Sequence, residues 1–161
     1  MKKELLKGLT MLALIVTLAL VTAVVSANAQ ANAGKVVANV PFEFSVGYKT
    51  MPAGEYSVQA IASANGLLIQ SADGNNSALR LSEATERIKD KSHARLVFHR
   101  YGERYFLAEV WNGVDNTGRM LIKSQEESAV ADELATIASA KENAHAPNTT
   151  YETVEVLAVL R

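Results

Sequence analysis

The sequence predicts a mainly β fold, an antiparallel sandwich or open barrel of seven to eight short strands with one late amphipathic helix. Three observations indicate this class. Apolar and polar residues alternate within several short runs of the chain. Turn-forming Gly, Pro and Asn residues separate these runs at intervals of roughly 8–12 residues, as in antiparallel β domains. Apolar residues at helical spacing occur near the C-terminal end.

The clearest predicted strand is residues 36–46, where side chains alternate over eleven residues. One face carries Val36, Ala38, Val40, Phe42, Phe44 and Val46. A helix cannot place residues with a period of two on one face. Pro41 lacks a backbone N–H, so we expect this strand to lie at a sheet edge or to carry a bulge.

Three further strands are predicted at residues 55–62, 67–71 and 78–82. Turns separate them at residues 51–54, at Asn65-Gly66 and at residues 73–76. Residues 83–92 carry mixed charges, and we expect a solvated loop or one helical turn there.

A hairpin is predicted from residues 95–101 and 104–111, which turn around Gly102. One face should carry Leu96, Phe98, Tyr105, Leu107 and Trp111, and the other Val97, His99, Tyr101, Phe106, Ala108 and Val110. Both faces are largely apolar, so we expect the hairpin to be central and covered on both sides. Phe42, Phe44, Phe98 and Leu107 should point into the core.

The late helix begins at a capping box, in which Ser124 is the N-cap and Glu127 the third helical residue. Val130, Leu134 and Ile137 follow at helical spacing, so an amphipathic helix at about residues 124–141 should lie on the sheet. A short apolar run at residues 120–122 precedes it. Residues 143–150 are predicted to be a linker, and residues 151–160, rich in β-branched side chains, a final strand.

The N-terminal segment is typical of a secretory signal peptide. Three lysines among the first seven residues precede an apolar run of about 17 residues. Ala27 and Ala29 then supply the small-x-small pattern of a cleavage site. We predict a signal peptide at residues 1–29, a β-rich domain at 30–142, and a linker with a C-terminal strand at 143–161. Ala33 marks the second choice of cleavage site.

Export makes the predicted location periplasmic or secreted. The apolar run is near the lower limit for crossing a bilayer as a helix, so an uncleaved membrane anchor is the alternative.

Charge and cysteine content exclude several classes of function. The chain has a net charge of −1, and without residues 1–29 it keeps 13 basic and 16 acidic residues. This balance gives no basic patch for nucleic acid. The absence of cysteine excludes disulfides, thiolate metal sites and a cysteine nucleophile.

A polar and aromatic cluster at the hairpin tip supplies the binding candidates, which are His99, Arg100, Tyr101, Arg104 and Tyr105. Arg and Tyr are common anchors in binding sites, although a cross-strand charge pair at the turn is the alternative. We expect His99 to be a buried or half-buried histidine bonded to a neighbour.

The three histidines, including His145 in the linker, lack the short-range spacing of metal ligands, so no metal site is predicted. The chain contains no nucleophile motif, phosphate loop or dinucleotide fingerprint. We therefore predict no catalytic residue and no cofactor.

Three motifs together resemble a group of short exported bacterial proteins. They are VPFEFSVG at residues 40–47, PAGEY at 52–56 and LVFHRYGERYFL at 96–107. The resemblance covers roughly residues 36–134 and implies export and a β-rich fold, without implying any chemistry. The strand at residues 151–160 looks like an addition to the pattern of the group, so its pairing partner stays open.

Export without a catalytic signature predicts a non-enzymatic envelope or periplasmic domain that binds or supports another envelope component. The alternative is an exported small-ligand carrier or hydrolase with a site near His99. A third hypothesis is a module tethered to the membrane by an uncleaved signal. The sequence leaves the oligomeric state open.

Overall fold

The described part of the chain, which in this computed structural model is residues 34–86, 93–114, 116–141 and 151–161, contains ten β-strands, one α-helix and a short 3-10 helix, η1 (Ala62–Ala64). The strands are β1 (Val36–Val40), β2 (Phe44–Val46), β3 (Lys49–Met51), β4 (Gly54–Ile61), β5 (Gly66–Ser71), β6 (Ser77–Glu86), β7 (Arg95–Tyr101), β8 (Arg104–Trp111), β9 (Thr117–Leu121) and β10 (Glu152–Leu160). The helix is α2 (Gln125–Lys141). The predicted mainly β fold with one late helix is confirmed.

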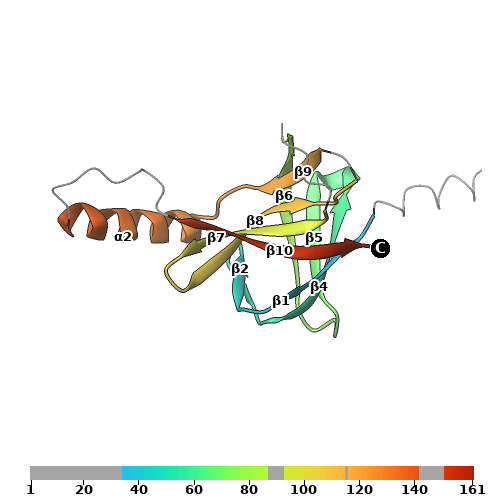
Figure 1. Ribbon diagram of the computed structural model, residues 1–161, viewed down its shortest axis with the longest axis horizontal. Coiled ribbons are helices and arrows are strands. Elements are labelled where there is room, and N and C mark those ends of the chain that lie inside the picture. The colour runs from blue at the N-terminus through green and yellow to red at the C-terminus, as the bar shows by residue number, and fades with distance from the viewer. Residues whose placement is uncertain (1–33, 87–92, 115, 142–150) are drawn as a thin grey trace, which may run out of the picture. The chain divides into compact units, whose positions relative to one another are not determined.

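Eight of these strands close into an antiparallel barrel (Figure 1). Their order is β8-β7-β10-β1-β4-β5-β6-β9, and β9 pairs back onto β8. Every neighbouring pair in this ring is antiparallel. Of the two predicted architectures the protein therefore has the barrel, and closure gives each of the eight strands a neighbour on both sides.

The two remaining strands, β2 and β3, form a small hairpin beside the ring. Strand β2 pairs antiparallel with β3 and parallel with β8 at one position, Ser45 with Phe106. Strand β3 was not predicted from the sequence, because its three residues show too little alternation to be recognised.

The C-terminal strand β10 closes the ring by lying between β1 and β7 (Figure 1). Val36 pairs with Leu160 on one side of β10, and Phe98 pairs with Val154 on the other. The backbones of Lys35 and Arg161 also exchange two hydrogen bonds, of 2.9 and 2.8 Å. The last strand therefore pairs within the chain and forms part of the same barrel as the strands before it.

Large apolar side chains fill the barrel between the described strands. The predicted inward residues Phe44, Phe98 and Leu107 are buried there, and Phe42 packs against them. The ring of Phe98 contacts the rings of Phe42 and Phe44 edge-on, with centroids 5.2 and 5.3 Å apart. Further fully buried side chains are those of Val40, Val46, Met51, Tyr56, Val58, Leu67, Ile69 and Leu96. The alternating side chains therefore form a packed interior, as the sequence predicts.

The predicted continuous strand at residues 36–46 is wrong, because the chain leaves the extended conformation between β1 and β2. Pro41 lies at this break, where its missing N–H removes no ladder hydrogen bond. Strand β1 is also not an edge strand, since β10 and β4 flank it. Side chains on both sides of the break nevertheless enter the same core.

A β-bulge in the β7–β8 hairpin exchanges the predicted faces of two residues. The pairing register skips Ala108, which is the extra residue of β8. Val110 consequently belongs to the inner core. Trp111 instead faces outward beside Arg95, whose guanidinium carbon lies 5.0 Å from the indole centroid. The predicted faces of Val110 and Trp111 are therefore wrong.

Strand β6 extends through residues 83–86, which the sequence predicted as a loop or helical turn. Glu83 pairs with Met120 and Glu86 pairs with Thr117, so this charged segment is part of the barrel wall and is hydrogen-bonded to the neighbouring strand β9. The prediction is wrong here because charged residues can occupy the outward positions of a strand. Residues 87–92 lie outside the described part.

Helix α2 begins as predicted, with the backbone N–H of Glu127 donating to the Ser124 hydroxyl over 3.1 Å. Its first half packs Val130 and Leu134 against Tyr101 and other residues outside the barrel. The helix then extends away from the strands (Figure 1), and Ile137 is 49% exposed. The expectation that the whole helix lies on the sheet is therefore wrong for its second half.

Some predictions fall outside the described residues: the signal peptide at residues 1–29, the Ala33 site, and the linker at 143–150 with His145. Among the described helices, none has the length and apolar character needed to cross a bilayer.

Gly113→Ala should destabilise the protein much more than Gly74→Ala. Both glycines have positive φ, 75° and 74°, so each substitution should cost about 1 kcal/mol of backbone strain. A Cβ at residue 113 would lie 2.6 Å from the carbonyl carbon of His93, whereas a Cβ at residue 74 meets nothing within 4 Å. We expect a total loss of about 3 kcal/mol for Gly113→Ala in urea unfolding. Equal midpoints for the two variants would contradict the described loop packing.

Candidate functional site

Side chains alternate between the two faces of the β7–β8 hairpin, so the five predicted binding residues do not all lie on the same face. His99, Tyr101 and Arg104 occupy outward positions of β7 and β8. Arg100 and Tyr105 pair with each other on the face that leads into the core. The sequence therefore found the correct hairpin, but the five side chains do not form one patch.

The inner pair is held by packing and local hydrogen bonds. The Tyr105 ring stacks on the Phe42 ring with centroids 3.9 Å apart. Arg100 lies over Tyr105, with its guanidinium carbon 5.6 Å from the ring centroid. Arg100 also donates to the Gly102 carbonyl over 2.7 Å and to the Glu152 carboxylate over 3.3 Å. The contact with Glu152 attaches β10 to the hairpin.

The outer group surrounds a buried carboxylate, that of Glu127 at the start of α2. Nδ1 of His99 lies 2.7 Å from Oε1 of Glu127. The Tyr101 hydroxyl donates to the same oxygen over 3.2 Å, and Lys123 Nζ donates to the Tyr101 hydroxyl over 3.3 Å. The Tyr151 ring covers His99 with a centroid separation of 4.0 Å. We call His99, Tyr101, Lys123, Glu127 and Tyr151 the Glu127 cluster.

Electrostatics keep Tyr101 a hydrogen-bond donor in this cluster. Burial, and then the negative charge of Glu127, raise the pKa of Tyr101 well above its ordinary value. The Tyr101 hydroxyl therefore keeps its proton throughout the physiological pH range and donates a hydrogen bond to the Glu127 carboxylate. A carboxylate that is 4% exposed needs such partners, because leaving it unpaired would be costly.

Arg104, the third outward candidate, lies beside the Glu127 cluster. It forms a salt bridge with Glu126 on α2 and stacks over Phe106, with 5.5 Å between its guanidinium carbon and the ring centroid. The sequence offered a cross-strand charge pair at the turn as the alternative to a binding role, but the ion-pair partner of Arg104 is Glu126 on the helix.

Sequence reasoning assigned Glu127 only to the capping box. A usable signal was present, since Glu127, Val130 and Leu134 share one helix face at positions i, i+3 and i+7. A carboxylate on the buried face of an amphipathic helix requires a partner in the sheet. His99, expected to bond a neighbour, is that partner.

The Glu127 cluster links the start of helix α2 to strand β7 through the His99 and Tyr101 side chains. Among the described residues, no serine or threonine hydroxyl hydrogen-bonds to His99. Across the described residues there is also no group of three or more His, Asp or Glu side chains that could hold a metal ion.

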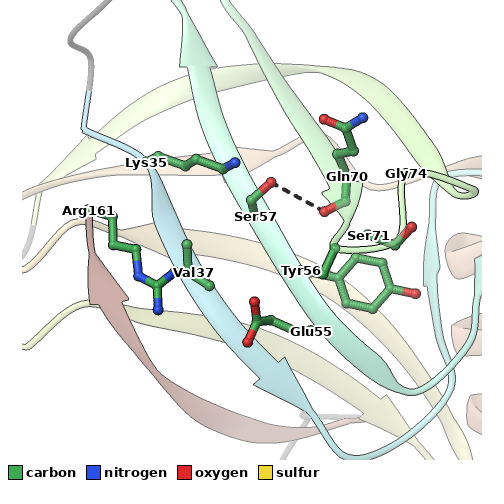
Figure 2. Close-up of a pocket in the computed structure, with 10 residues that line it drawn as sticks. Lys35, Val37, Glu55, Tyr56, Ser57, Gln70, Ser71, Gly74 and Arg161 are labelled. Atoms are coloured by element: carbon green, nitrogen blue, oxygen red, sulfur yellow. Dashed lines mark hydrogen bonds between the residues drawn. The ribbon is translucent and has the colours of Figure 1, made fainter.

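A second candidate site lies on the outer wall of the barrel, across β1, β4 and β5 (Figure 2). Here the surface is hollowed by about 300 Å³. Figure 2 shows Lys35 and Arg161 on neighbouring strands, with Val37 close to both. The Ser57 hydroxyl donates to the Gln70 carbonyl over 3.3 Å. We call this site the wall pocket; it is lined by Lys35, Val37, Glu55, Tyr56, Ser57, Gln70, Ser71, Ala72, Gly74 and Arg161.

A smaller depression of about 240 Å³ lies where the β2–β3 hairpin meets the β7–β8 hairpin. Arg104 and Tyr105, two of the predicted binding residues, contribute to its lining with Glu43 and Glu103. The Arg104 side chain is already paired with Glu126, which leaves this depression with a surplus of carboxylates.

Comparison with known proteins adds no assignment: no protein family, no curated protein and no solved structure matches the chain.

Glu127→Ala should destabilise the protein by about 2–3 kcal/mol, because it removes a charged acceptor that His99 and Tyr101 share in a buried site. Glu126→Ala is the matched control. It removes a neighbouring first-turn carboxylate, and with it a partly exposed salt bridge worth less than about 1 kcal/mol. Urea unfolding of both variants measures the difference. Equal losses would show that the Glu127 cluster contributes nothing beyond the helix dipole.

Proposed function

We propose that this protein is an exported cell-envelope or periplasmic domain that works without catalysis, by binding another component on the outer wall of its barrel. The observation that carries the proposal is the packed interior. Eight-stranded barrels either fill their interior with side chains or enclose one small ligand. Here Phe44, Tyr56 and Phe98 are at most 1% exposed and occupy the space that an enclosed ligand would need.

Export is supported by the N-terminal pattern of lysines, apolar run and small residues at the predicted cleavage site. The outer wall is the surface that remains for recognition, and it carries the wall pocket. It also carries exposed apolar residues, including Leu79 and Leu81 on β6 and Leu157 and Val159 on β10. Exposed apolar side chains are common on protein surfaces, so the wall pocket is the more specific feature.

The alternative is a hydrolase centred on His99. It is favoured by the 2.7 Å contact between His99 and Glu127, since a carboxylate beside a histidine orients the ring in many hydrolases. The packing argues against a hydrolase, because Tyr101, Tyr151 and the start of α2 surround the imidazole ring of His99.

The test is a titration of the mature, methyl-labelled protein with fractionated envelope extract of its native host, followed by NMR. The sample should be recovered after export, and an intact mass that starts at Gln30 verifies the predicted maturation. We expect shifts of outward methyl groups such as those of Val37, Leu68 and Leu79, and no shift of Val58 or Ile69 inside the barrel. Shifts confined to the inner methyl groups, or turnover of ester or amide substrates that His99→Gln abolishes, would overturn the proposal.

A further inference from the structure

We propose that the wall pocket binds a short peptide with free termini, two or three residues long, holding its carboxylate at Lys35 and Arg161 and its ammonium group at Glu55. This inference rests on the proposed function, because it names a ligand class for the outer wall of the barrel. It follows from how the strands place three charged side chains in one hollow.

The cationic end is created by closure of the barrel. Lys35 precedes β1 and Arg161 follows β10, and two backbone hydrogen bonds join them directly. Both residues therefore line the wall pocket where β1 begins and β10 ends; in Figure 2 the Lys35 ammonium points toward Ser57 and the Arg161 guanidinium lies beside Val37. Neither side chain forms an ion pair with a described residue. Two cations on adjacent strands, neither paired with a described residue, favour a ligand carboxylate, which accepts charge-assisted hydrogen bonds from both.

The anionic end lies on the neighbouring strand. Glu55, the second residue of β4, is in register with Asn39, which follows Lys35 by four residues along the chain. At the usual strand rise this places the two backbone positions about 13 Å apart. The Glu55 carboxylate is exposed and makes no ion pair with a described residue. It is therefore available to a ligand ammonium group.

Polar side chains occupy the middle of the wall pocket. Ser57 and Gln70 pair across β4 and β5, with both side chains on the outer face. Ser71 continues the lining, and Val37 adds a small apolar surface. The serine hydroxyl and the glutamine amide can each accept a hydrogen bond from the N–H of a bound peptide group or donate one to its C=O. Because these residues lie on barrel strands, their geometry is fixed before binding.

Size and polarity together select the ligand. A volume of about 300 Å³ lies at the lower end of ligand sites. The termini of an extended peptide of two or three residues are about 7–10 Å apart, which fits between long side chains whose backbone positions are about 13 Å apart. A dianion would meet the Glu55 carboxylate, and a dication would meet Lys35 and Arg161. A ligand with a carboxylate at one end and an ammonium group at the other matches the charges at both ends of the wall pocket.

The experiment compares three matched probes on the mature protein: triglycine, N-acetyl-triglycine without the ammonium charge, and triglycine amide without the carboxylate. Calorimetry gives the affinities and the Val37 methyl signal reports the location. We expect triglycine to bind at least about tenfold more tightly than either blocked probe, which is about 1.4 kcal/mol for each terminal charge. Galacturonate and inorganic phosphate test for a site that accepts any small anion.

Variants assign each terminus to its partner. With Glu55→Gln, triglycine and its acetylated form should bind equally. With Lys35→Gln and Arg161→Gln combined, triglycine and its amide should bind equally. Glu103→Gln and Lys49→Gln remove exposed charges elsewhere and should leave all affinities unchanged, and unaltered melting temperatures confirm that every variant is folded.

Three outcomes would overturn the inference: equal affinity for all three peptides, galacturonate or phosphate binding as tightly as triglycine, or binding that Glu55→Gln leaves unchanged. If none of the probes binds while envelope extract still shifts outward methyl groups away from Val37, the peptide assignment fails and the proposed function stands. If the extract shifts no outward methyl group, the proposed function fails as well.

Discussion

Pairing of β10 with both β1 and β7 is the constraint on which the rest of the structure depends. Without it, β1 and β7 would present unpaired backbone groups, and the interior would open between them. With it, the inward side chains Val154 and Val156 join Phe98 and Leu96 in one closed core. The strand that looked like an addition to a known pattern is therefore the one that completes the barrel.

Closure also decides where chemistry can occur. It packs the interior, so polar groups that could recognise a ligand are left to the wall and the rim. It brings Lys35 and Arg161 together from opposite ends of the described chain. It places Tyr151, directly before β10, over His99, so the same strand that completes the core also covers the anchor of helix α2. The wall pocket and the Glu127 cluster are thus both products of one long-range pairing.

Local pattern was sufficient for most of the strands and for the start of the helix. Tyr56 and Val58 point inward as alternation predicts, and Ser124 caps the helix as its spacing with Glu127 predicts. Features that depend on distant partners could not be read locally. The bulge at Ala108 is defined by its register against β7, and strand character at residues 83–86 comes from β9. The wall pocket was missed for the same reason, since nothing near Lys35 in the sequence points to Arg161.

The most direct test of the account is a set of cross-strand nuclear Overhauser effects from β10 in the mature protein. The closed barrel predicts contacts from Val154 to Phe98 and from Leu160 to Val36 in the same sample, together with slow exchange of the β10 amides. Contacts to one neighbour only, or a β10 segment whose amides exchange as fast as a free chain, would contradict closure of the barrel.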